Sequence, residues 1–479
     1  MPSSYWPFPA FPLSPFSRTA SPTPSTTQTA HAYFPFSSQT PALSTTDSPS
    51  RDVSPVTPAQ EMEWEDADLL SVDRALMDFA AGEADREEEW MREERDVRVK
   101  ALWVHPIKSC RGVSVQKSVV TSQGLQYDRQ WAIREVETSQ MCTAREYPSM
   151  VLIEPEIDEI NNLLIVRFPE ATGLPGFAVK LNVDESEIRT WQKVGPTIMH
   201  KKPLPAAFVP PHVPFVASVD PNLTPSAQLS TYLSRPVQFI QKSPFEEDKR
   251  PLVPPPGSPD WLVGGDVEYA EKRGAETGFA DGYPVLLASE ESFRDIQASL
   301  EASLNPRGDS LFANIGPTFN KPVWQKKKLD LRRFRANVIV GSGPTSSDRV
   351  QAWEEETWRD VEFWGQAEED QVQVVEGEDD VTMNTDKAQQ VGRFVRRGGM
   401  VCVSRCGRCQ LPNVDPDNAE ADKAVPYKII AKYRRVDPAQ KFTPIFGVNA
   451  VPREERSLVC VGDRVRVTGK NTWQVIERS

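Results

Sequence analysis

From residue 97 onward the chain alternates short apolar runs with turn residues, and this texture is the strongest limit on what it can fold into. Val97–Val104 is the first run, and further strand candidates follow at 113–120, 131–134, 150–154 and 163–168. Short runs rich in β-branched and aromatic residues are typical of strands. Because no helical periodicity separates these runs, we expect a small β-barrel or sandwich.

The second half of the sequence mixes helices with strands. Ser289 precedes two glutamates, and a hydroxyl cap followed by acids in the first turn is typical of a helix start. A helix is also predicted over 223–234, a strand over 336–341, a helix with Pro426 in its first turn, and two final strands within 458–467. The predicted fold class is therefore α+β, and mainly β.

The length and composition predict several segments. At 479 residues the chain has room for two or three domains. We expect a disordered Pro/Ser/Thr-rich tail over 1–60, because its composition cannot bury enough apolar surface to offset the entropy of ordering. An acidic helical arm is predicted over 61–96, a first domain over 97–240, and a second domain over 251–468 with an acidic insertion at 365–395.

The charge is unevenly distributed. The net charge of the chain is −13, but two acidic segments, 61–96 and 365–389, together carry −18, so the remainder carries +5. A mildly basic folded part suits an anionic ligand, and nothing in it calls for nucleic acid.

No run approaches eighteen apolar residues, so no membrane span is expected. Six cysteines without a secretory signal indicate reduced thiols and an intracellular protein. The Arg-poor tail favours the cytoplasm over mitochondria.

Three of the six cysteines lie within eight residues, at Cys402, Cys406 and Cys409, beside Arg405 and Arg408. They follow an apolar run and precede a Pro/Asn/Asp turn cluster, so we expect a strand that delivers thiols into a loop. Thiolate is the form of cysteine that binds metals or attacks carbon, and adjacent guanidinium groups favour it. The sequence therefore predicts a metal-ligand or nucleophile site in this loop.

The spacing of these cysteines has other interpretations. Cys-x3-Cys-x2-Cys also holds the four-iron cluster of radical S-adenosylmethionine enzymes, but those enzymes carry the motif early in a long barrel, and only seventy residues follow Cys409. Cys406 and Cys409 alone are typical of half a zinc site or of a thioredoxin-like redox pair, yet neither a second pair nor the expected helix start is present. Buried core cysteines are the interpretation favoured for the remaining four.

The segment from Arg408 to Asp417, with the sequence Arg-Cys-Gln-Leu-Pro-Asn-Val-Asp-Pro-Asp, closely resembles the metal-binding loop of the MOSC family. This family is named after the C-terminal domain of molybdenum cofactor sulfurase and includes the mitochondrial amidoxime-reducing components. Further segments resemble the family in its order: 103–112, 124–131, 143–148, 281–290, 334–340, 446–449 and 461–463. The resemblance covers roughly 97–468 and implies an N-terminal MOSC-type β-barrel followed by a MOSC β-barrel domain with flanking helices.

The resemblance also implies a cofactor. In this family a cysteine thiolate coordinates molybdenum beside the pterin dithiolene, and Cys409 is the matching position, as metal ligand and catalytic residue. A soft thiolate suits this metal. The phosphate and pterin of the molybdenum cofactor (Mo-molybdopterin) need forked cationic donors and small polar groups. By matching position, the residues that would supply them are Lys108, Ser109, Arg129, Arg335, Asn337, Arg408 and Asn449.

The chain departs from the family pattern at three positions near the expected site. Gly282 and Tyr283 stand where the amidoxime-reducing members have two hydroxyl residues, and Gly407 replaces a serine beside the metal ligand. These differences bear on cofactor hydrogen bonds and on substrate preference. The pyridoxal-phosphate sulfurase domain of some family members is not expected, because the first 96 residues could not hold it.

The activity implied by the resemblance is a molybdenum oxidoreductase that reduces N-hydroxylated substrates, such as amidoximes or hydroxylamines, by removing an oxygen atom. The sequence contains no ferredoxin spacing, haem-attachment motif or dinucleotide fingerprint. Electrons would therefore come from the family's external partners, a cytochrome b5 and its NADH-dependent reductase. Two alternatives remain at this point: a non-catalytic carrier of the molybdenum cofactor, and a scaffold that keeps only the fold.

Overall fold

The computed structural model describes residues 95–213, 223–250, 252, 276–308, 310–344, 347–366, 394–454 and 456–472. The predicted tail over 1–60, nearly all of the predicted arm over 61–96 and most of the predicted acidic insertion lie outside these residues. No helix among the described residues is long and apolar enough to cross a membrane.

Seven strands of the described chain close into a barrel, because β15 pairs with β14 on one side and with β1 on the other. In pairing order the strands are β15 (Val338–Ser342), β14 (Val285–Ser289), β18 (Ile445–Pro452), β17 (Phe394–Gly407), β16 (Trp358–Gln366), β20 (Arg464–Lys470) and β1 (Val97–Val104). Strands β14 and β15 are parallel, and the other neighbours are antiparallel. The short strand β2 (Val113–Val115) pairs with β1.

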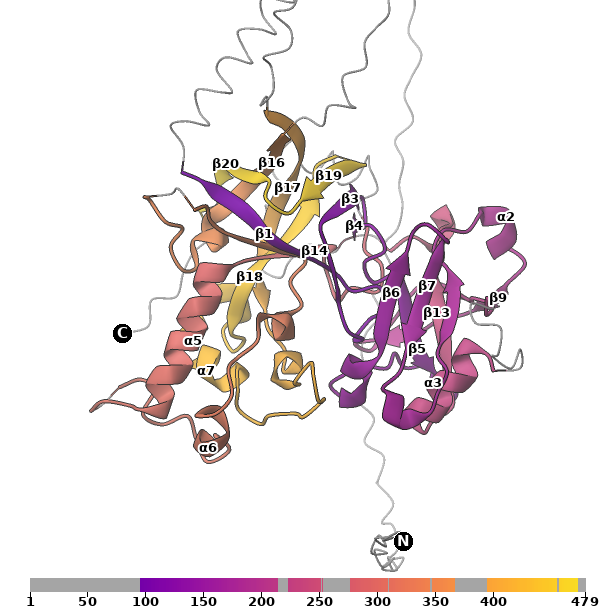
Figure 1. Ribbon diagram of the computed structural model, residues 1–479, viewed down its shortest axis with the longest axis horizontal. Helices are drawn as coiled ribbons and strands as arrows, with labels where there is room; N and C mark the ends of the chain where they lie inside the picture. Colours follow the sequence, from indigo (N-terminus) through magenta and orange to yellow (C-terminus); the bar gives the residue numbers. More distant parts are fainter. Residues whose placement is uncertain are drawn as a thin grey trace, which may run out of the picture. The chain divides into compact units, whose positions relative to one another are not determined.

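The pairing of strand β1 differs from the sequence prediction. The resemblance implies that this strand opens an N-terminal barrel. In the structure Leu102 of β1 pairs with Val338 of β15, and Arg98 pairs with Arg464 of β20. Figure 1 shows this indigo strand among the orange and yellow strands of the C-terminal half. An alternating pattern identifies a strand, but the edge on which it pairs is decided by tertiary packing. The first strand of the described chain thus completes the barrel of the last ones.

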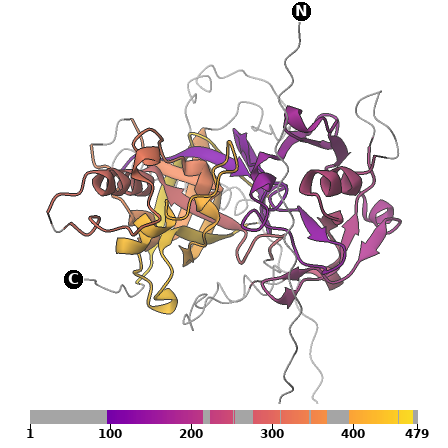
Figure 2. The same ribbon diagram turned by 90° about the horizontal axis from the view of Figure 1, so that it is seen from below.

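Between β1 and residue 250 the chain forms smaller sheets. One contains β5 (Trp131–Glu135), β13 (Val237–Lys242), β12 (Ala207–Val209) and β9 (Gln192–Val194), and another contains β6 (Glu154–Asp158), β7 (Leu163–Arg167) and β8 (Phe177–Lys180). Phe177 and Phe239 meet edge to face with ring centroids 5.2 Å apart, so these two sheets share a core. Figure 2 shows their magenta strands grouped apart from the orange and yellow ones.

Two further pairings involve short strands. Strand β3 (Lys117–Thr121) pairs with both β4 (Gly124–Leu125) and β19 (Ser457–Cys460), which again joins an early segment to a late one. Strand β10 (Ile198–Met199) pairs with β11 (Lys202–Pro203) in a separate hairpin. Two final strands, β19 and β20, occur close to where the sequence predicts them, on either side of a turn at Gly462.

One predicted strand is wrong. Residues 150–152 belong to a 3-10 helix, η1 (Pro148–Leu152), and a strand begins only at Glu154. Pro148 stands in the first turn, where its fixed φ suits a helical conformation. Met150 and Val151 are buried in the core. A short apolar run cannot by itself distinguish a buried helical turn from a buried strand.

Two helices cover a second hydrophobic cluster beside the barrel. Helix α5 (Glu290–Leu304) begins after Ser289, whose hydroxyl accepts a hydrogen bond from the Ser292 N–H, as the cap pattern predicts. Ile296 and Leu300 of α5 pack in the same cluster as residues of α7 (Tyr427–Tyr433). Pro426 is the N-cap of α7. The other helices are α2 (Glu185–Ile188), α3 (Pro225–Leu233), α6 (Lys321–Trp324), η2 (Glu170–Thr172), η3 (Glu246–Asp248), η4 (Leu331–Phe334), η5 (Glu354–Thr357), η8 (Leu411–Asn413) and η9 (Pro438–Gln440).

The predicted acidic insertion connects two paired strand ends. Gln366, the last residue of β16, pairs with Phe394, the first residue of β17. The margins of the predicted insertion, 365–366 and 394–395, are therefore strand. The insertion joins two neighbouring strands of the barrel, at the end opposite to the one where β17 leads into Cys409.

Candidate functional site

The eight site residues predicted from the sequence line one cavity of about 500 Å³, the first cavity. Their sources are the loop after β1 (Lys108, Ser109), the residues before β5 (Arg129), the segment from η4 to β15 (Arg335, Asn337), the residues after β17 (Arg408, Cys409), and β18 (Asn449). The structure thus brings together residues from five distant parts of the chain. A cavity of this size can hold a cofactor or a small ligand.

Cys409 lies where strand β17 gives way to a loop, as the sequence predicts. The strand ends at Gly407, and Leu411 begins the next helical turn. The Cys409 side chain is half-buried, and its Sγ accepts a hydrogen bond from the Leu411 N–H at 3.4 Å. This arrangement leaves a thiol in the cavity wall, held by the backbone of its own loop.

The neighbouring Cys406 has a different environment. Arg408 Nη1 donates to Cys406 Sγ at 3.1 Å. Burial raises the pKa of the Cys406 thiol, and the nearby Arg408 charge opposes that rise only in part. Cys402 is fully buried, and burial raises its pKa to about 12, which suits a core residue. All six cysteines are free thiols.

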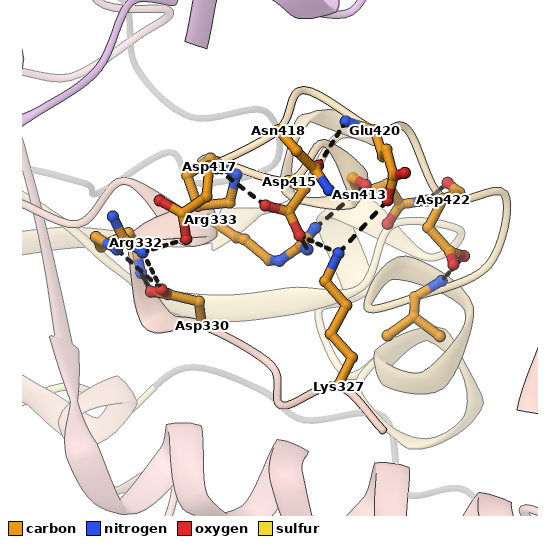
Figure 3. Close-up of polar contacts among 12 residues, drawn as sticks. Lys327, Asp330, Arg332, Arg333, Asn413, Asp415, Asp417, Asn418, Glu420 and Asp422 are labelled. Carbon is orange, nitrogen blue, oxygen red and sulfur yellow. Dashed lines mark hydrogen bonds and ion pairs between the residues drawn. The ribbon is translucent and has the colours of Figure 1, made fainter. Parts of the chain in front are cut away.

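The loop after Cys409 is anchored by Asp415, as Figure 3 shows. Arg333 Nη2 donates to Asp415 Oδ2 at 2.5 Å, and Lys327 pairs with the same oxygen. The other oxygen, Oδ1, accepts from the Asp417 N–H at 2.9 Å. Asp415 and Arg333 are both buried, so this pair is shielded from solvent. The Asp-Pro-Asp end of the motif therefore fixes the loop that carries Cys409.

Asn337 ties three walls of the first cavity together. Its Nδ2 donates to the Trp103 carbonyl at 3.1 Å, and its Oδ1 accepts from the Leu286 N–H at 3.1 Å and from Arg129 Nη1 at 3.0 Å. Arg129 Nη2 also donates to the Arg335 carbonyl at 3.1 Å. The amide oxygen is thus fully used within the protein, and its main effect is to orient Arg129.

The first cavity carries a surplus of positive charge. Six basic side chains and the single carboxylate of Asp281 line it. Among the described residues, no carboxylate lies within ion-pair distance of Arg145, Arg335 or Arg408. Arg335 donates only to the Cys110 carbonyl, at 2.6 Å. Burial, together with the Arg129 charge, lowers the pKa of Arg335 to about 10, so it stays cationic at neutral pH.

Lys108, Asp281 and His200 form a line at one wall. Lys108 Nζ donates to Asp281 Oδ1 at 2.6 Å and to the Phe279 carbonyl at 2.8 Å, and His200 Nε2 lies 3.0 Å from the same Oδ1. Burial lowers the pKa of Lys108, and Asp281 opposes that effect. Burial alone would raise the pKa of Asp281, but Lys108 and His200 hold it well below its usual range. This line extends from the buried amine to a histidine that is 44% exposed.

The part of the chain that the structure describes contains no group of three or more His, Cys, Asp or Glu side chains placed to hold a metal ion. The zinc and iron–sulfur interpretations of the cysteine cluster require such a group. A metal at Cys409 would instead take one protein thiolate and complete its coordination with ligands from outside the protein.

Comparison with known families identifies the architecture. Residues 96–200 match the model of the MOSC N-terminal beta barrel domain, and residues 275–466 match that of the MOSC domain. The chain belongs to the MOSC family. Strand β1 falls within the segment matched by the N-terminal domain, although it pairs in the barrel formed by the MOSC domain.

Several curated relatives in the MOSC family are similar over most of this chain. Mitochondrial amidoxime reducing component 2 of Rattus norvegicus is 25% identical over 359 residues, which cover 73% of this chain and 77% of that protein. The component 1 protein of Homo sapiens is 23% identical over 381 residues, 78% of this chain and 83% of that protein. Molybdenum cofactor sulfurase of Solanum lycopersicum is 22% identical over 375 residues, 77% of this chain but only 35% of the sulfurase.

The departures from the MOSC pattern have structural counterparts. A side chain at Gly407 would clash with the Gln440 carboxamide, which lines the first cavity beside it. The Tyr283 hydroxyl hydrogen-bonds Ser404, which also accepts from Asn449 Nδ2 at 2.9 Å. Sequence reasoning missed Gln440 and Ser404 as lining residues: Gln440 belongs to no motif, and Ser404 lies within the cysteine cluster, where only the thiols and arginines were considered.

Proposed function

We propose that this chain is a molybdenum-cofactor-binding oxidoreductase that reduces N-hydroxylated compounds. The observation that carries the proposal is the half-buried thiol of Cys409 in a cavity with a surplus of basic side chains. A cofactor that combines a thiolate-binding metal with a phosphate group requires both features. The names of the relatives, amidoxime reducing components and molybdenum cofactor sulfurase, support the cofactor and the reaction class.

The residues divide by chemistry. Cys409 would supply the thiolate ligand, while Arg335, Arg408 and Lys108 would hold the anionic phosphate with charge-assisted hydrogen bonds. Ser109, Asn449 and the oriented Arg129–Asn337 pair would contact the polar pterin.

The bound cofactor would supply two-electron redox chemistry at molybdenum. Conversion of R–NH–OH to R–NH2 and water consumes two electrons and two protons, so an external donor is needed. We assign that role to a cytochrome b5 and its NADH-dependent reductase.

The first test is the molybdenum and pterin content of protein from a cofactor-competent host. We expect close to one molybdenum per chain in the wild type, a loss of most of it in Cys409→Ala, and little change in Cys406→Ala. The Cys406 variant is the matched control, because this thiol lines the same cavity and already pairs with Arg408. A folded wild-type protein without molybdenum would refute the proposal.

Catalysis is tested on the loaded protein. With a reduced viologen as artificial donor, we expect benzamidoxime or hydroxylamine to be reduced, and Cys409→Ala to be inactive. A loaded protein that reduces neither compound, but hands its pterin to an apo-enzyme, would instead be a carrier of the cofactor. Retention of the pterin during turnover supports the oxidoreductase.

A further inference from the structure

A second cavity of about 450 Å³ lies next to the first one and shares two lining residues with it, Arg335 and Leu411. Of the residues that the proposed function assigns to the cofactor, Arg335 alone lines it. Its other walls come from β1, from the loop after β1, from η1, from η4 and β15, and from the loop after Cys409. Its volume is sufficient for a small organic molecule.

The walls of the second cavity are mainly apolar. The side chains that provide this surface are Trp103, Val151, Leu331, Ile339, Leu411 and Val414. They belong to elements that are packed in the two hydrophobic clusters, so the apolar surface is built into the fold. An apolar cavity with an indole in its wall favours a flat hydrocarbon or aromatic body.

The polar groups of the second cavity are nearly all hydrogen-bond donors. Four arginines line it, Arg111, Arg332, Arg333 and Arg335, against one carboxylate, Asp330. Asp330 is already bonded to Arg332, at 2.6 Å and 2.8 Å. Guanidinium groups cannot accept hydrogen bonds. A ligand that pairs with these guanidinium groups must therefore supply hydrogen-bond acceptors.

Three of these four arginines are already paired with carboxylates. Arg111 pairs with Glu154 at 2.5 Å, Arg333 with Asp415 at 2.5 Å, and Arg332 with Asp330 and Asp417 (Figure 3). Arg335 has no carboxylate partner among the residues that the structure describes, and its Nη2 has no hydrogen-bond partner. One uncompensated guanidinium calls for one negative charge, whereas a phosphate dianion would bring too much charge into apolar walls.

His105 adds a neutral, buried ring to this wall. It is 3% exposed, and its Nδ1 has no hydrogen-bond partner. Burial, with the charges of Arg335 and Arg129, lowers its pKa to about 3, so the ring contributes no charge at neutral pH. Among the described lining residues, the positive charge without a carboxylate partner therefore belongs to Arg335.

We propose that the second cavity binds a planar organic monocarboxylate, with its flat body against Trp103 and the apolar walls and its carboxylate toward Arg335 and Arg111. Arg335 and Leu411 line both cavities, and the Leu411 N–H donates to Cys409 Sγ. The carboxylate therefore touches the residues that shape the first cavity. Occupants of the two cavities influence each other's affinity reciprocally, as linkage requires.

The test is isothermal titration calorimetry of 2-naphthoate into the purified wild-type protein. We expect saturable binding with one site per chain. Leu331→Trp narrows the cavity and Arg111→Gln removes a donor, so each should weaken binding about tenfold, or ~1.4 kcal/mol. The neutral analogue 2-naphthylmethanol should also bind about tenfold more weakly than 2-naphthoate, because it lacks the charge. Circular dichroism verifies that both variants are folded.

Arg145→Gln is the control, because Arg145 is exposed and lines only the first cavity. We expect it to leave the affinity for 2-naphthoate unchanged. No saturable binding at millimolar 2-naphthoate, equal affinity in the wild type and in folded Leu331→Trp and Arg111→Gln, or weakening in Arg145→Gln alone would each overturn the proposal. The readout is a heat of binding, so it needs no reductase activity; all variants are compared at the same molybdenum content, because Arg335 lines both cavities.

Discussion

Asp415 carries a charge that lines neither cavity, yet it fixes the loop that follows Cys409. Its carboxylate is shared by Arg333, Lys327 and the backbone N–H of Asp417, and it is buried with Arg333. Removal of one partner from a buried pair leaves the other charge uncompensated, which costs several kcal/mol. The position of the Cys409 loop thus depends on a carboxylate that bonds to side chains and backbone of the protein itself.

We predict that Asp415→Asn lowers the free energy of unfolding by about 3 kcal/mol. Asp417→Asn is the matched control: its carboxylate is 60% exposed and pairs with the partly exposed Arg332, so we expect a loss below about 1 kcal/mol. Urea unfolding at pH 7 measures both. Equal losses in the two variants would mean that the buried Asp415 carboxylate stabilises the loop after Cys409 no more than the exposed Asp417 carboxylate does.

His105 gives the structure a sensitivity to acid. Its ring is buried between Asp128, Arg129 and Arg335, and burial is the main reason that its pKa falls to about 3. In the unfolded chain a histidine titrates near 6.5. The unfolded state therefore binds more protons below pH 6.5, so the contribution of His105 to stability is lost as pH falls from about 6.5 toward 3.

From this shift we predict that the wild type loses about 2 kcal/mol between pH 7.5 and pH 5 through His105 alone. A glutamine at position 105 cannot titrate. Between pH 7.5 and pH 5, the free energy of unfolding of His105→Gln should therefore fall by about 2 kcal/mol less than that of the wild type. Urea titrations at the two pH values measure the difference. If the two proteins lose the same stability between pH 7.5 and pH 5, protonation of His105 is not responsible.

At the scale of an element, helix α5 is held at its first turn by a buried carboxylate. Glu355 Oε2 accepts from the hydroxyls of Ser289 and Ser292, each at 2.8 Å. Burial, and then the charge of Glu356, raise the pKa of Glu355 to about 7. A glutamate whose folded pKa is raised destabilises the fold as pH rises from about 4.5 to 7, which is the opposite sign to His105.

The corresponding variant is Glu355→Gln, which keeps the shape of the side chain without its charge. We predict that its stability relative to the wild type improves by about 2 kcal/mol between pH 5 and pH 8. Thermal unfolding across this interval, with Glu354→Gln as an adjacent comparison, measures the trend. A relative stability that stays constant with pH would contradict the raised pKa.

Helix α5 also marks the limit of what the sequence predicts. Its Ser289 cap follows from a local pattern, whereas Glu355 lies 66 residues away and no local signal connects the two. Eight of the residues that line the first cavity could be predicted because each belongs to a short motif in a recognisable order. The second cavity could not be predicted, although much of its lining belongs to the same motif segments, because nothing in those motifs indicates that Trp103, Ile339 and Val414 face a common space. Likewise, the pattern of Val97–Val104 predicts a strand but not the edge on which it pairs.

At the scale of the whole described unit, the two family segments are joined by contacts that neither contains alone. Strand β1 belongs to the first segment but closes the barrel of the second, through Leu102 opposite Val338. Lys108 reaches Asp281, and Arg129 reaches Asn337, so the first cavity is also assembled from both segments. The barrel of the second segment therefore depends on β1, a strand of the first segment, for part of its hydrophobic core.

We therefore predict that Leu102→Ala, at a fully buried position of β1, destabilises both segments together by about 3 kcal/mol. Hydrogen exchange measures this directly: protection should fall at amides of β7 and of β14 by similar amounts, whereas the half-buried Lys100→Ala should have little effect at either strand. If protection falls in β7 alone, β1 does not support the C-terminal barrel. If it falls in β14 alone, the two segments unfold independently, and the contacts across the first cavity do not couple them.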